Sequence, residues 1–439
     1  MTSVMMKSVC WTIVGLCLLL PSVLSYRPGD PFYNKEKIQT VASWASLDFA
    51  FPSVQARQES IQHGDFIPGS ATPIDFEIIK TLGGTKMFVS LPRFQEGTPA
   101  TLGYFMYQNS NSPVILPYPN WEMNRLGNCQ GITSVFRIRI DECGRLWVLD
   151  TGRLGAQRIC PPQLLIFNPK TDEILRRYRF PESQLTNSSL LINLIVDIRD
   201  PQGQCKDTFV YISDVQGFQI IVYDYANHRS WNIRNNLFYP YPPFGTITIN
   251  GLSFDLMDGI FTGALSPIKN GDRILYFHSL ASNVESYVST SILRNYYLFK
   301  DNPNAAAREF KSFAKTRIAQ AASEAMDKNG VLFYGLVPEV AIGCWNSRDY
   351  PEYGGDNLEV LIADKNTLQF ASSMKIISSP SGKDELWMIT MSLQKVWTGT
   401  INPKETNFRI LAASTDELVR GTKCDVTSYR VKPHGSWPY

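Results

Sequence analysis

Histidine is the side chain that most often acts as a general base near neutral pH, and His278 lies in a strand-like run of this sequence. In Tyr276-Phe277-His278, alternation along a strand places the imidazole on the face opposite Phe277. The sequence therefore offers His278 as a catalytic base. The alternative is a structural histidine whose ring nitrogens bond to groups inside the protein.

A second set of polar residues follows two apolar runs. Asp150, Thr151 and Arg153 come after Leu146-Trp147-Val148-Leu149, and Asp214 ends the next comparable run. Polar strand ends of this kind can surround a concave ligand site, so we expect these residues to contact a ligand. The alternative is that the two aspartates cap loop backbone through their side chains.

Other kinds of chemistry find little support in the sequence. There is no Ser-His-Asp string, Walker loop or dinucleotide fingerprint. Four histidines and the absence of a Cys-x-x-Cys pair argue against a structural zinc site. The 42 basic and 40 acidic residues form no long block of either sign, which argues against a nucleic-acid partner. We therefore predict no metal and no cofactor.

A repeated unit of short strands must position these residues. Each unit has an apolar strand, a turn with Asp, Gly or Asn, a more buried strand and one or two strands with polar edges. Such turns open the segments 83–90, 141–153, 205–214, 258–263, 327–335 and 382–390. A repeat of roughly fifty to seventy residues with about four strands is typical of a propeller blade. We therefore predict an all-β fold, a six-bladed β-propeller; a β-sandwich is the alternative, but it does not explain this repeat.

Three further expectations concern particular segments of the propeller. Trp44–Phe51 should close it by completing the last blade beside 386–390 and 407–412, since an open sheet edge would otherwise remain. The alanine-rich segment 304–315 should form a helix between blades four and five. Trp147, Tyr211 and Trp387 lie inside strand runs and should pack in the core.

The N-terminus predicts export. Residues 1–25 combine Lys7, an apolar run from Cys10 to Leu20 and a small residue at Ser25, the pattern of a cleavable signal peptide. No later stretch is both apolar and long enough to span a bilayer. We expect a secreted, extracellular protein with one propeller domain over 26–430 and a short tail over 431–439.

Six cysteines remain after the signal peptide, and an even number in an exported chain predicts disulfides. Only cysteines on the same face of the propeller can come close enough to bond. Blade geometry pairs Cys129 with Cys160 on one face and Cys143 with Cys205 on the other, and elimination leaves Cys344 with Cys424. Asn187-Ser188-Ser189 is a glycosylation sequon in a polar stretch, so Asn187 is a predicted glycan site.

Several motifs in order resemble the yellow and major royal jelly protein family of insects, and the string over 141–152 is most similar to the yellow branch. The segments that carry the resemblance are 44–52, 88–93, 97–102, 141–152, 275–282, 288–294, 342–345 and 406–410. The family is six-bladed, which agrees with the repeat count. The resemblance implies a role in cuticle pigmentation or melanin synthesis and a small catechol or indole ligand in a central pocket.

The resemblance also suggests an activity, the conversion of dopachrome by tautomerisation or decarboxylation. Such a site needs a base and a cation that holds the carboxylate, roles that His278 and Arg153 could fill. The alternatives are a binding protein for catechol or biogenic amine ligands, which performs no chemistry, and a structural cuticle component.

The last blade departs from the pattern of amine-binding relatives. Those relatives resemble Leu-Trp-x-Leu-Ser-Asn-Arg-x-Gln, with the asparagine and a following aromatic near the ligand. Here Met391 and Leu393 stand at these two positions. The resemblance therefore places Met391 and Leu393 beside the ligand and implies weakened binding of serotonin-like amines.

Overall fold

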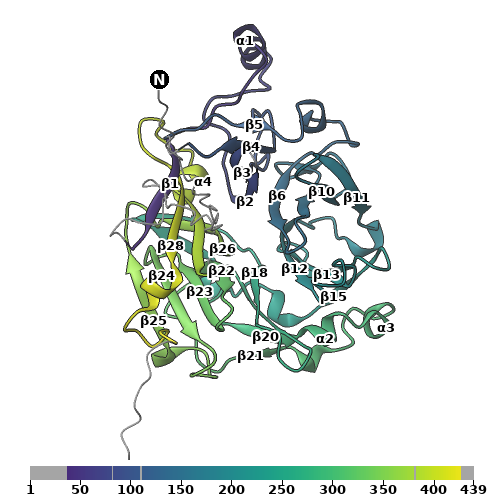
Figure 1. The fold of residues 1–439 in the computed structure, drawn as a ribbon, viewed down its shortest axis with the longest axis vertical. Coiled ribbons are helices and arrows are strands. Elements are labelled where there is room, and N and C mark those ends of the chain that lie inside the picture. Colours follow the sequence, from purple (N-terminus) through teal and green to yellow (C-terminus); the bar gives the residue numbers. More distant parts are fainter. Residues whose placement is uncertain (1–36, 82, 109–110, 380–381, 427–439) are drawn as a thin grey trace, which may run out of the picture.

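The computed structural model describes residues 37–81, 83–108, 111–379 and 382–426, and these form six four-stranded antiparallel sheets arranged as a β-propeller (Figure 1). The expected signal peptide, residues 1–25, and the expected tail, 431–439, lie outside the described residues. The predicted six-bladed propeller is confirmed, and the sandwich alternative is excluded. No helix within the described ranges is long and apolar enough to cross a membrane.

The innermost strand of each blade lines a central channel. Blade one contains β2 (Asp75–Thr81), β3 (Gly84–Ser90), β4 (Leu102–Met106) and β5 (Leu116–Pro117); blade two contains β6 (Val135–Ile140), β7 (Leu146–Asp150), β10 (Gln163–Asn168) and β11 (Glu173–Arg179). Blade three contains β12 (Leu191–Ile198), β13 (Thr208–Asp214), β14 (Gln219–Asp224) and β15 (Arg229–Arg234). Blade four contains β18 (Ile260–Leu265), β19 (Ile274–Ser279), β20 (Ser286–Ser289) and β21 (Lys311–Ser312). Blade five contains β22 (Ala321–Met326), β23 (Val331–Leu336), β24 (Ala341–Asn346) and β25 (Leu358–Ala363).

Blade six joins the two ends of the described chain. It contains β26 (Phe370–Ser378), β27 (Asp384–Met391), β28 (Phe408–Ser414) and, as its outermost strand, β1 (Gln39–Trp44). Figure 1 shows the purple β1 beside the yellow β28. Closure by an N-terminal strand is confirmed, but the strand ends at Trp44 instead of beginning there. Phe49, further along the expected segment, forms an isolated parallel bridge to Ile115.

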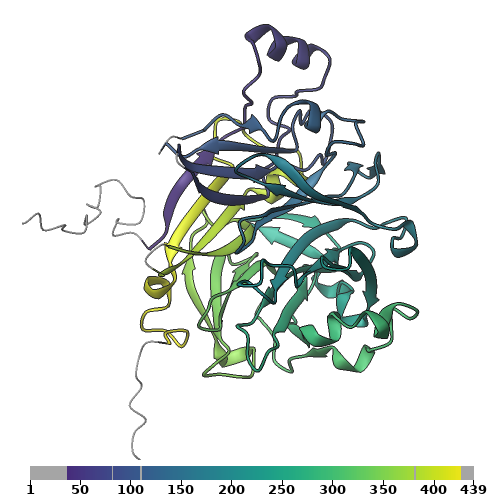
Figure 2. The same ribbon diagram turned by 45° about the vertical axis from the view of Figure 1, so that its right-hand side comes forward.

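Short elements connect the blades. They are two small hairpins, β8–β9 (Arg153–Leu154 and Gln157–Arg158) and β16–β17 (Thr246–Ile249 and Leu252–Asp255), and the helices α1 (Val54–Gln62), α2 (Thr290–Leu293), α3 (Tyr296–Phe299), α4 (Leu393–Trp397) and α5 (Thr415–Val419). Helix α1 projects from the propeller and buries no side chain (Figure 2).

The core lies between neighbouring blades. Every residue of β7, β14, β23, β24 and β27 is buried, because these middle strands have a sheet neighbour on each side and another blade against each face. Burial on both faces explains why they read as continuous apolar runs. Trp147, Tyr211 and Trp387 are buried here, as expected.

Two sequence expectations were wrong. The segment 304–315 is no helix: it contains a 3₁₀ turn at Ala307–Glu309 and then β21, which completes blade four. Burial of Phe310 against Phe238 and Phe277 outweighs the helix propensity of the alanines. The turn at Asp258 was expected to join the first and second strands of its blade, as the turns of the other repeats do. It instead comes before the first strand and leads directly into the innermost strand β18.

Three disulfides stabilise the propeller. Cys129–Cys160, Cys143–Cys205 and Cys344–Cys424 have Cα separations of 5.4, 6.4 and 6.4 Å. These are the predicted pairs. The third links β24 of blade five to the segment after α5, so it fastens the end of the described chain to the propeller.

Candidate functional site

A cavity of about 420 Å³ opens where the innermost strands begin, and we call it the mouth cavity. Helix α4 from blade six and the β8–β9 hairpin from blade two contribute to its wall. Most of its lining is apolar, and aromatic rings come from several blades. The large apolar residues are Phe94, Phe136, Leu190, Ile192, Leu256, Phe261, Phe370, Met391, Leu393, Val396 and Trp397. A concave apolar site with a few polar groups is typical of small-molecule binding.

Asp258 is the carboxylate of the mouth cavity. Asp258 is 9% exposed, and its carboxyl group makes no hydrogen bond or ion pair within the described residues. Burial raises the pKa of Asp258 to about 7. The group can therefore both accept and release a proton near neutral pH. The next residue must be small, because a Cβ on Gly259 would lie 2.4 Å from the carbonyl oxygen of Phe238.

Three arginines also line the mouth cavity, namely Arg93, Arg137 and Arg153. All three are largely buried. Burial lowers the pKa of Arg137 and Arg153, and it lowers that of Arg93 to about 10. Arg93 remains cationic at neutral pH, since its pKa stays well above 7. A guanidinium in a protein stays protonated in general, so Arg137 and Arg153 are treated as cations too.

Arg153, Met391 and Leu393 line this one cavity, and their roles toward a ligand stay predictions. Asp150 and Asp214 are not among the residues that line it. Asp150 accepts hydrogen bonds from the amides of Thr133 and Ser134, at 2.9 and 2.7 Å.

Asp214 braces a loop in the same way, through the amides of Leu190 and Gly217, both at 2.8 Å. The Thr151 hydroxyl lies 3.3 Å from the carbonyl oxygen of Ser134. These contacts match the loop-capping alternative.

Asn187 lies in an exposed turn between β11 and β12, and its carbonyl oxygen accepts a hydrogen bond from Arg153 at 3.2 Å. The sequon is therefore accessible near the wall of the mouth cavity. Its glycosylation stays a prediction.

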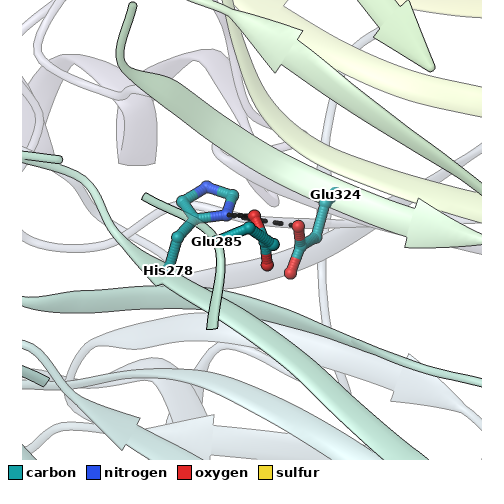
Figure 3. Close-up of side chains that lie close together, drawn as sticks. All are labelled: His278, Glu285 and Glu324. Carbon is teal, nitrogen blue, oxygen red and sulfur yellow. Dashed lines mark hydrogen bonds and ion pairs between the residues drawn. The ribbon is translucent and has the colours of Figure 1, made fainter. Parts of the chain in front are cut away.

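His278 is fully buried between blades four and five, away from the residues that line the mouth cavity. Its Nδ1 lies 3.0 Å from a carboxylate oxygen of Glu285 and 3.2 Å from one of Glu324 (Figure 3). Its Nε2 lies 3.1 and 3.0 Å from the carbonyl oxygens of Ala321 and Ala322. Both ring nitrogens therefore face acceptors, an arrangement that suits an imidazolium with two N–H donors.

The charges around His278 favour the same cationic form. Burial and the neighbouring Arg317 would lower the pKa of His278, but the carboxylates of Glu324 and Glu285 outweigh them and raise it to about 9. Arg317 contacts Glu285 and also donates to the Tyr353 hydroxyl at 3.0 Å. The two carboxylates are thus matched by two cations.

A metal ion is the other possible partner for this cluster. Ligand atoms of His278, Glu285 and Glu324 lie within 4.8 Å of one another. However, the guanidinium of Arg317 already contacts Glu285, and a divalent cation beside it would leave the buried cluster with excess positive charge. The donor set does not favour a metal, and we treat the cluster as an ion-pair network that joins two blades.

Asp258, Arg93 and Arg137 are the charged cavity residues that the sequence analysis missed. Asp258 stands in an ordinary Asp-Gly pair, and Arg137 lies inside a strand. One signal in the sequence could have pointed to Asp258. In the fourth blade the turn pattern comes before the first strand, whereas in the other five blades it comes between the first and second strands.

Comparison with known proteins agrees with this architecture. The family model described as major royal jelly protein matches residues 133–424. Protein yellow of Drosophila subobscura is 34% identical over 430 residues, which cover 95% of this chain and 72% of the relative. Protein yellow of Drosophila melanogaster is 32% identical over 436 residues, with 96% and 75% covered.

One relative is named for an enzyme activity: the dopaminechrome tautomerase of Drosophila melanogaster. It is 31% identical over 404 residues, which cover 89% of this chain and 85% of the relative. From the fold, the family match and these relatives together, the chain belongs to the major royal jelly protein family, on the side of the yellow proteins.

Proposed function

We propose that this protein isomerises a catechol-derived aminochrome in the mouth cavity, with Asp258 as the group that transfers the proton. The observation that carries the proposal is a buried carboxyl group in a cavity lined by aromatic rings, which has no hydrogen bond or ion pair among the described residues and whose pKa is raised to about 7. The relative named dopaminechrome tautomerase supports the reaction class. Such a reaction belongs to pigment and melanin synthesis, for example in cuticle.

The reaction needs no oxidant. The carboxylate of Asp258 removes a proton from a carbon of the five-membered ring, and the electron pair of that C–H bond moves into the ring system. One quinone oxygen takes up a proton, and a second C–H bond of the five-membered ring then loses its proton in the same way while the other quinone oxygen is protonated. Two C–H bonds are thus replaced by two O–H bonds, and the product is a dihydroxyindole. In the decarboxylating variant the C–C bond to the carboxylate breaks in place of one of these two C–H bonds, and carbon dioxide leaves.

The extracellular site of action is part of the same proposal. Three disulfides are typical of proteins from oxidising compartments, and the N-terminal sequence has the pattern of a signal peptide.

Asp258→Asn tests the assignment. We expect the variant to lower the conversion of dopaminechrome or dopachrome by about 10²-fold or more, because the amide cannot accept the proton. Loss of the visible colour, corrected for heat-inactivated protein, measures the rate. In the wild type, kcat/KM should rise with pH and level off above about 7, as the carboxyl group loses its proton.

Asp255→Asn is the matched control, since Asp255 is an exposed carboxylate outside the mouth cavity. This variant should keep the wild-type rate. The alternative function is a protein that binds catechols or amines without converting them, and the apolar lining at Met391 and Leu393 is compatible with it. Wild-type protein that binds an aminochrome but leaves its decay at the blank rate would establish that alternative.

A further inference from the structure

The arginines of the mouth cavity have no carboxylate partner within the described part of the chain, as neither their hydrogen bonds nor the ion pairs include one. Arg93 donates to four backbone carbonyl oxygens, through Nε, Nη1 and Nη2. Arg137 donates to the carbonyl oxygens of Ile74 and Ser372, at 3.1 and 2.7 Å. Arg93 and Arg137 therefore hold backbone segments in place, and the carboxylates of Asp150 and Asp75 act on them electrostatically without a hydrogen bond or ion pair.

Arg153 differs from the other two because most of its donors are free. A guanidinium has five N–H donors, and the side chain of Arg153 makes one hydrogen bond within the described residues, from Nη2 to Asn187. Its Nε is buried and has no hydrogen-bond partner in the part of the chain that the structure describes. An unsatisfied buried donor is costly, so this guanidinium is poised to bind an acceptor.

The charged groups that line the cavity favour an anion. Three cations and one carboxyl group, Asp258, line it. Asp150, Asp75 and Asp214 also interact electrostatically with the arginines, but they do not line the cavity. Charges removed from water interact more strongly than exposed ones. A cationic amine would add to the repulsion, whereas an anionic group would relieve it.

We infer that the mouth cavity selects flat aromatic ligands that carry a carboxylate, and that Arg153 binds this carboxylate with two parallel N–H donors. The aromatic lining accommodates the ring, and the fork geometry of a guanidinium matches a carboxylate. This inference rests on the proposed function for its ligand family, and it names the substrate class. Among aminochromes it favours dopachrome, which keeps the amino-acid carboxylate, over dopaminechrome, which lacks one.

Binding measurements without turnover test the inference. Indole-2-carboxylate and indole-2-carboxamide have almost the same shape and differ in charge. By titration calorimetry, the wild-type protein should bind the carboxylate at least about tenfold more tightly, which corresponds to about 1.4 kcal/mol. Arg153→Met should bring this ratio close to one while the affinity for the carboxamide stays unchanged, and Arg153→Lys should restore part of the preference.

Arg158→Met is the matched control, because Arg158 lies in the same hairpin but pairs with Glu182 and does not line the cavity. It should keep the wild-type ratio. Equal affinities in the wild type, a preference that survives in Arg153→Met, or no binding of either compound at millimolar concentration would each overturn the inference. Asp258→Asn separates the two proposals: the carboxylate preference should persist in this variant even though turnover is lost.

Discussion

Replacing His278 by alanine is expected to destabilise the protein by about 3–5 kcal/mol, because it leaves buried carboxylates without one of their two cations. Glu285 and Glu324 have fully buried side chains, so water cannot replace the lost imidazolium. Urea or thermal unfolding measures the loss. The activity that remains should fall only in proportion to the folded protein, since His278 does not line the mouth cavity.

Two comparisons isolate the ion-pair network. His63→Ala removes an exposed histidine at the end of α1 and should leave the free energy of unfolding nearly unchanged. Adding Glu324→Gln to His278→Ala removes one carboxylate as well, so the double variant should lose less stability than the sum of the single variants. Additive losses, or turnover abolished in fully folded His278→Ala protein, would refute the structural role.

The same network predicts how stability depends on pH. The pKa of His278 is about 9 in the folded protein and about 6.5 in an unfolded chain. Because the folded value is the higher one, its contribution is complete below pH 6.5 and is lost as the pH rises through 9. Asp258, with a folded pKa of about 7, titrates mostly below this upper window. Between pH 7 and 9 the wild type should therefore lose more stability than His278→Ala does.

The fold could be predicted from the sequence because its signals are local. Each blade repeats a turn and a fully buried strand, as in Asp141–Asp150, and these patterns need no knowledge of distant contacts. The disulfides followed from the same repeat, since the position of a cysteine within its blade decides on which face of the propeller it lies.

The functional groups were harder to predict because their roles depend on contacts between blades. His278 meets Glu324 from the next blade, and this contact makes the imidazole an ion-pair partner. Asp258 is an unremarkable residue until other segments exclude water from its carboxyl group. Asp150 shows the reverse case, because its strand-end position suggests a ligand contact but its oxygens are occupied by loop amides.

Deleting residues 37–44 is expected to prevent the protein from reaching a folded, secreted state. The deletion removes β1 and leaves β28 as an exposed sheet edge, which invites aggregation. It also removes Trp44, which is 1% exposed, packs edge-on against Phe105 and donates to the carbonyl oxygen of Pro113 at 2.9 Å. The yield of protein from secreting cells measures the effect.

A point substitution keeps this prediction testable when the deleted protein cannot be recovered. Trp44→Ala should cost about 3–5 kcal/mol, the usual loss for a large aromatic side chain in a core. Trp397→Ala is the matched control, because that indole is 50% exposed on α4 and its removal opens no core cavity. If the two variants unfold at the same urea concentration, or if the deleted protein is secreted at the wild-type level, β1 does not carry the closure of the propeller.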